Sequence, residues 1–191
     1  LEGCITNYPQ SNKLNVVATI FPYYDFAKEV GGNKVEVHLL VPPGTESHTF
    51  DPRPSDIVKI YNSDVFIYTG AGMEPWISDV LSGSGSNSTI IIQASNFSSL
   101  IAETIADDKN SDVNSGYDPH IWTDFQNDEN IVNSIADAFS QKDPANSEYY
   151  KINAKNYVYN LKLIDARFFT ELKNCSTRTY INTGHQSFAY M

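Results

Sequence analysis

Histidines are the residues of this sequence whose chemistry says most about its function. Three of the four, His48, His120 and His185, follow predicted strand ends or lie in loops rich in Gly, Pro or Asp. Such loops can hold imidazoles rigidly, and three histidine nitrogens with one oxygen complete a tetrahedral zinc site. Imidazole also suits copper, iron and nickel, so ligand type alone leaves the metal open. Each histidine taken singly is more often an ordinary residue, but their shared placement predicts one site for a divalent transition metal.

The fourth histidine, His38, differs from the other three in its setting. It lies within a run that alternates apolar and polar residues, so we expect it on a strand. We expect no acidic or histidine neighbour within its reach. His38 is therefore interpreted as a surface or satisfied histidine rather than as a ligand.

Strands alternate with helices over the first half of the chain. β-branched apolar runs predict strands at 14–20, 34–40, 65–68 and 89–93, and helices are predicted at 22–30, from 54 onward and at 76–81. This spacing predicts βαβ units that form an α/β fold with a parallel sheet. Ligands of such sheets bind beyond the carboxyl ends of the strands, and His48 follows one such end.

The second half is predicted to be mainly helical. A helix is expected at 129–139, and Asp143-Pro144 combines a capping side chain with Pro at the first helical position. An apolar seam then continues to residue 173 through Tyr150, Ala154, Tyr157, Leu161, Ile164, Phe168 and Leu172. A helix of that length would span about 45 Å, more than one small domain needs, so we expect it to link two lobes.

The domain organisation follows from these elements. We expect a tether at 1–13, an N-terminal α/β lobe at 14–142, a long linking helix at 143–174 and the start of a truncated C-terminal lobe at 175–191. That second α/β lobe would begin with a strand at 179–182, and its exit loop would carry His185.

Composition excludes several classes of function. A net charge of −10 argues against nucleic acid as a partner, and an acidic surface concentrates cations, although solubility alone also explains it. No stretch approaches the roughly 20 apolar residues that span a bilayer. With 41% hydrophobic residues the chain can form a substantial core.

Two cysteines give neither a zinc–thiolate cluster nor a disulfide scaffold. The first four residues, LEGC, resemble the end of a lipobox, which implies that Cys4 is lipidated and followed by a flexible tether. Membrane contact is expected only through that anchor. Cys175 has no evident partner in the sequence.

Three motifs resemble the ligand motifs of the zinc- and manganese-binding solute receptors of ABC importers. They are GTESHTFDPRPSD at 44–56, DPHIWTD at 118–124 and TGHQSFAY at 183–190, and GAGMEPWI at 70–77 and DPAN at 143–146 also fit the family. The resemblance implies two α/β lobes joined by a rigid helix, with the metal between them. It also implies a fourth, carboxylate ligand from a part of the second lobe that is not present here.

This resemblance implies capture of a metal outside the cytoplasm, at the cell surface or in the periplasm, and delivery to the membrane permease of an ABC importer. Histidine rather than glutamate at position 185 favours Zn²⁺ over Mn²⁺ within the family. Two departures stand out: the acidic segment 103–117 contains no histidine, and Phe125 replaces the usual proline.

Supporting roles are expected for residues beside the ligands. A ligating imidazole usually donates its other N–H to a carboxylate or carbonyl, and Glu46, Asp118 and Asp124 are the candidates by proximity. Glu46 could instead be a weak extra ligand, and turn formation or helix capping explains all three equally well. The aromatic residues expected to wall the site are Phe50, Trp122 and Phe188.

Two other functions remain open at this point. A metallohydrolase also uses three histidines and leaves a position for water, but no separate general base stands out, so we expect no enzyme. An adhesin or interaction protein on the same fold is the second alternative. A receptor for iron chelates or cobalamin would not need three converging histidines.

Overall fold

The computed structural model describes residues 13–83, 88–102, 116–177, 179–181 and 186–191, and shows a three-layer α/β/α lobe. Its centre is a four-stranded sheet in the order β2-β1-β3-β4. The strands are β1 (Leu14–Ala18), β2 (Val35–Leu39), β3 (Val65–Tyr68) and β4 (Ile90–Gln93). All three pairings are parallel, so the predicted parallel α/β sheet is confirmed.

The two central strands are apolar on both sides because helices cover both faces of the sheet. Along β1, Val16 and Ala18 point into one core, while Val17 between them points into the other. In β3, Val65 and Ile67 join the first core, and Phe66 and Tyr68 join the second. Successive side chains of a strand point to opposite faces, so one short apolar run serves both cores.

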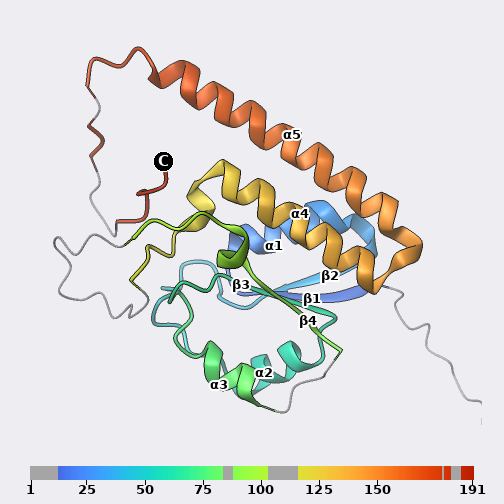
Figure 1. Ribbon diagram of the computed structural model, residues 1–191. Helices are drawn as coiled ribbons and strands as arrows, with labels where there is room; N and C mark the ends of the chain where they lie inside the picture. The colour runs from blue at the N-terminus through green and yellow to red at the C-terminus, as the bar shows by residue number, and fades with distance from the viewer. Residues whose placement is uncertain (1–12, 84–87, 103–115, 178, 182–185) are drawn as a thin grey trace, which may run out of the picture.

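Helices lie on each face of the sheet (Figure 1). On one face are α1 (Phe21–Gly31), α4 (Phe125–Lys142) and α5 (Ser147–Leu172), and on the other are the shorter α2 (Pro54–Tyr61) and α3 (Ile77–Ser82). Pro22 and Pro54 lie in the first turns of α1 and α2, where a missing N–H costs nothing. The short 3₁₀ helices are η1 (Gly32–Lys34), η2 (Ala94–Phe97), η3 (Ile121–Thr123) and η4 (Pro144–Asn146).

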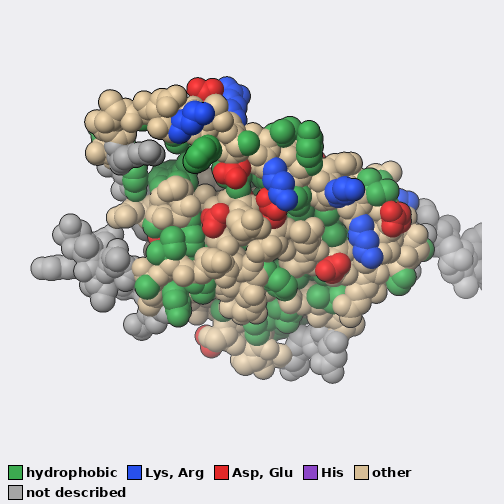
Figure 2. Space-filling model, turned by 45° about the horizontal axis from the view of Figure 1, so that its top comes forward, with side chains coloured by type: hydrophobic (Ala, Val, Ile, Leu, Met, Phe, Trp, Pro, Cys, Tyr) green, Lys and Arg blue, Asp and Glu red, His purple; other side chains and the backbone are tan. Residues whose placement is uncertain are grey.

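Helix α5 buries one face along its first half and is exposed along its second. Tyr150, Ala154 and Leu161 are buried in the core that β1, α1 and α4 share. Further along the same seam, Ile164, Phe168 and Leu172 are 46%, 41% and 51% exposed. Figure 2 brings the α5 side of the lobe forward, and there apolar side chains lie among acidic and basic ones. The lobe therefore uses only part of the predicted seam.

Two boundaries of the helical half differ from the sequence prediction. Helix α4 begins four residues earlier than expected, because the side chain of Asp124 accepts a hydrogen bond from Gln126 N and caps it. Asp143-Pro144 starts a 3₁₀ turn rather than α5 itself. The Asp143 carboxylate instead accepts hydrogen bonds from Asn146 Nδ2 and the Tyr150 hydroxyl, which lowers the pKa of Asp143.

The strand expected at 179–182 is wrong for residues 179–181, which form no regular element. A strand needs a neighbour to pair with, and the described residues offer none at that place. Within the described parts of the chain, none of the helices combines the length and apolar character that crossing a membrane requires. Residues 1–12 of the expected tether, which include Cys4, and His185 lie outside the described residues.

Candidate metal centre

His48 and His120 lie side by side although they come from different loops. Their ring centroids are 5.4 Å apart, and the ring planes meet at 64°. His48 lies in the segment between β2 and α2, and His120 directly precedes η3. Imidazoles that bind one metal must come this close, since zinc–nitrogen bonds are about 2.0–2.1 Å long.

The loop that carries His48 is held by short-range backbone contacts. Thr45 N donates to Pro42 O at 3.1 Å, and Gly44 adopts a φ of 80°, which favours glycine. Glu46 turns back so that its Oε1 accepts a hydrogen bond from His48 N at 3.3 Å. Glu46 therefore shapes the turn through the backbone of His48, which is the turn-forming alternative that the sequence left open.

The carboxylate of Asp118 contacts both the backbone N–H and the ring of His120. Asp118 Oδ1 accepts from His120 N at 2.9 Å and lies 2.7 Å from His120 Nδ1. Since an ionised carboxylate only accepts, Nδ1 carries the proton, and Nε2 is the nitrogen suited to a metal. The His120 side chain is only 7% exposed, and the Trp122 ring lies at an angle of 64° to its ring, 5.3 Å away.

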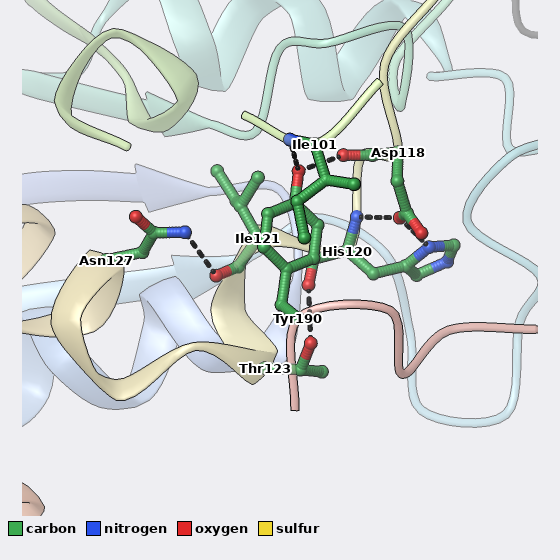
Figure 3. A network of polar contacts seen from close by, with 7 residues as sticks. All are labelled: Ile101, Asp118, His120, Ile121, Thr123, Asn127 and Tyr190. Atoms are coloured by element: carbon green, nitrogen blue, oxygen red, sulfur yellow. Dashed lines mark hydrogen bonds and ion pairs between the residues drawn. The ribbon is translucent and has the colours of Figure 1, made fainter. Parts of the chain in front are cut away.

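Further contacts fix the backbone around His120 (Figure 3). Thr123 Oγ1 donates to His120 O at 2.8 Å, and Asn127 Nδ2 donates to Ile121 O at 3.3 Å. Asn127 Oδ1 also accepts from Ser99 N at 2.8 Å, which ties α4 to the segment after β4. The loop is thus bound to α4, and through Asn127 it is linked to the segment after η2.

The platform beneath the loops contains a buried carboxylate that the sequence analysis did not assign. Glu74 Oε1 accepts from Thr19 Oγ1 at 2.7 Å and from Thr69 N at 2.9 Å. Its Oε2 accepts from Gly70 N at 3.0 Å. Burial raises the pKa of Glu74 even though these hydrogen bonds lower it. Because Thr19 and Thr69 follow β1 and β3, Glu74 joins the two central strands at their carboxyl ends.

A cavity of about 220 Å³ lies between the start of α1, the turn after β2 and Trp122, and neither His48 nor His120 lines it. Its walls include Ile20, which follows the central strand β1, Val41, which follows the edge strand β2, the turn at 42–45, and Trp122. This position agrees with the expected location of a ligand site at the carboxyl edge of a parallel sheet.

The other residues predicted to support or wall the site do not contact the histidine pair in one common way. Asp124 caps α4, and Phe50 packs against Trp76 and both cores. Phe188 is 42% exposed. No third Cys, His, Asp or Glu completes a metal cluster with the histidine pair among the residues described here, and His185 is not one of them.

The interpretation of His38 needs one correction. It is exposed on β2, as expected, but its Nε2 lies 4.0 Å from Glu36 Oε1. Residues two apart on a strand share a face, so an acidic neighbour was within reach after all.

The α/β/α lobe thus carries paired histidines near the carboxyl edge of its parallel sheet, where ligands of such folds bind. The chain belongs to the ZnuA family, "Zinc-uptake complex component A periplasmic", whose model matches residues 16–191. "Zinc-binding protein AdcA" of Streptococcus pyogenes serotype M6 is 32% identical over 193 residues, covering 94% of this chain and 37% of that protein. "High-affinity zinc uptake system protein ZnuA" of Bacillus subtilis is 30% identical over 187 residues, covering 95% and 58%.

A solved structure shows the same fold. Zn(II)-bound AdcA from Streptococcus pneumoniae superimposes with a TM-score of 0.80 at 28% identity, covering 93% of this chain and 36% of that one. The predicted membership of this receptor family is therefore confirmed. The chain spans less than two thirds of the length of these relatives.

Proposed function

We propose that this chain takes part in high-affinity capture of a divalent transition metal, with Zn²⁺ as the solute. The observation that carries the proposal is the contact of His48 with His120, whose Nδ1 is held by Asp118. Membership of a zinc-uptake family supports zinc, as does the Zn(II)-bound relative. Mn²⁺ is the alternative cargo.

The proposed ligands are His48, His120 and His185. His120 would bind through Nε2, because Asp118 holds Nδ1. His185 is included on its sequence motif alone. A fourth position would be filled by a carboxylate from a second lobe or by water. Glu46 and Asp124 contact backbone N–H groups, so we assign them to shaping the loops rather than to binding metal.

The setting of this activity is also a proposal. The relatives are named as zinc-binding and zinc-uptake proteins, and one from Streptococcus pneumoniae is named a lipoprotein. We infer an extracytoplasmic protein that is anchored through a lipid on Cys4 and hands its metal to the permease of an ABC importer. Residues 143–174 would link the two lobes of the whole protein. No catalytic role is assigned to the site.

Metal content tests the proposal directly. Protein purified without chelators should contain about one equivalent of zinc by inductively coupled plasma mass spectrometry. Chelator competition should show Zn²⁺ bound more tightly than Mn²⁺. His48→Ala, His120→Ala and His185→Ala should each lose that zinc, whereas His38→Ala is the matched control and should retain it.

Full zinc binding by His120→Ala would remove the site assignment. A panel of ester, phosphate and peptide substrates separates a receptor from a hydrolase. Zinc-dependent turnover of any of them would overturn the receptor function.

A further inference from the structure

Tyr190 contacts the loop that presents His120, although it lies beyond α5 in the sequence. Its hydroxyl donates to Asp118 O at 2.7 Å and accepts from Ile101 N at 3.1 Å. Figure 1 shows the last residues of the chain beside the segments that follow β4 and precede α4, and Figure 3 shows the phenol between Ile101 and Asp118. The Tyr190 ring also packs against the main core.

The hydroxyl of Tyr190 completes a small hydrogen-bonded bridge. Asp118 N donates to Ile101 O at 3.0 Å, and Ala102 pairs with Tyr117 in an antiparallel bridge. The phenol hydroxyl bridges the backbone carbonyl of Asp118 and the backbone N–H of Ile101. Both the N–H and the C=O of Asp118 are therefore hydrogen-bonded. Burial raises the pKa of Tyr190, so the phenol is neutral and can donate over the physiological range.

Holding the backbone of Asp118 also fixes its carboxylate. That carboxylate contacts His120 at both N and Nδ1 and thereby sets the tautomer and the direction of the ring. We propose that Tyr190 is a positioning residue for the metal site, acting on His120 through Asp118. This inference rests on the proposed function only where zinc affinity is concerned, because the effect on the His120 ring exists without metal.

Tyr190→Phe tests the inference, since it removes one oxygen and keeps the ring. Zn²⁺ affinity, measured against a competing fluorescent chelator, should fall about three- to tenfold, less than the roughly 10- to 100-fold cost of losing a direct partner of a ligand. In the metal-free protein, long-range ¹H–¹⁵N spectra of the imidazoles should show His120 losing its single tautomer. Tyr180→Phe changes an exposed phenol of the same segment and should alter neither readout.

A double-mutant cycle separates positioning from a general loss of structure. If Tyr190 acts through the carboxylate, Tyr190→Phe should cost much less zinc affinity in an Asp118→Ala background than in the native chain. Additive losses would overturn the proposal, as would an unchanged His120 spectrum in Tyr190→Phe. If the native chain binds no zinc, the proposed function fails, while the His120 spectrum still decides the role of Tyr190.

Discussion

Asp118 contacts both the backbone N–H and Nδ1 of His120 with a single carboxylate oxygen, at 2.9 and 2.7 Å. One side chain therefore shapes the turn and orients the imidazole. Asp124, in the same motif, contacts only backbone, as the cap of α4. The two aspartates have different roles although the sequence presents them alike.

Replacing each aspartate by asparagine should separate these roles. Asp118→Asn keeps the shape but weakens the contact to Nδ1, so we expect zinc affinity to fall about 10- to 100-fold with little change in melting temperature. Asp124→Asn should retain zinc and leave the free energy of unfolding almost unchanged, because asparagine is also a good cap. Chelator competition and thermal unfolding measure the two effects. Equal zinc affinities for the two variants would contradict the assignment.

Zinc affinity should fall steeply below about pH 6. Only neutral imidazole binds a metal, and the side chain of an ordinary histidine has a pKa of about 6.5. Below that pH, each ligand that must lose a proton lowers the zinc affinity by up to about tenfold per pH unit. Competition titrations between pH 7.5 and 5 would measure the slope, and His120→Ala should show a shallower one. A flat profile in the native chain would indicate that carboxylates dominate the site.

Asp128 should make the lobe less stable as the pH rises. It is 5% exposed in α4, and burial, with the nearby charge of Asp124, raises its pKa to about 8. Between about pH 4 and 8 the native state holds a proton that the unfolded chain has released, so the free energy of unfolding decreases as pH increases. Asp128→Asn should remove this slope and be the more stable protein above pH 8.

Denaturant unfolding at several pH values checks the prediction for Asp128. Asp137→Asn is the matched control, since Asp137 is an exposed aspartate on the same helix. Parallel stability profiles for Asp128→Asn and the native chain would show that burial of this carboxyl group does not matter.

Two leucines of α5 should differ sharply in their contribution to stability. Leu161 is 7% exposed and belongs to the main core, whereas Leu163 is 53% exposed. Leu161→Ala should lower the free energy of unfolding by about 2–5 kcal/mol, because it removes buried methyl groups and leaves a cavity. Leu163→Ala should stay within about 0.5 kcal/mol of the native chain. Urea unfolding compares them, and similar losses would mean that both halves of α5 are equally packed.

The sequence predicted the regular elements well because their signals are local. The strands at 14–20 and 65–68 and the helix at 54 are specified by apolar runs and by proline at a helix start, and these features act over a few residues. The sequence predicted one continuous apolar seam along α5 but could not say that only its first half packs into this core, because a long apolar stripe does not specify how many surfaces cover it.

The histidine pair could be anticipated because the sequence motifs around His48 and His120 were recognisable, but the residues that support the pair could not. Tyr190 lies in a recognised motif, yet nothing in that motif says that its hydroxyl meets Asp118 O. Asn127 and Glu74 accept hydrogen bonds from backbone N–H groups, and no regular spacing of residues in the sequence marks such contacts. These partners are chosen by the tertiary fold rather than by neighbours in the chain.

The parallel sheet also has a consequence for how fast the lobe forms. Each of its three strand pairings is parallel and joins segments separated by a whole crossover connection. None of these pairings can therefore begin at a tight hairpin turn. Helix α1 also depends on distant parts of the chain, since Asn153 Nδ2 donates to Val30 O and the Tyr157 hydroxyl donates to Asp25. Proteins dominated by such distant contacts fold slowly. The hydrogen bonds of α1 to α5 can therefore form only after the ribosome has released the chain beyond Tyr157.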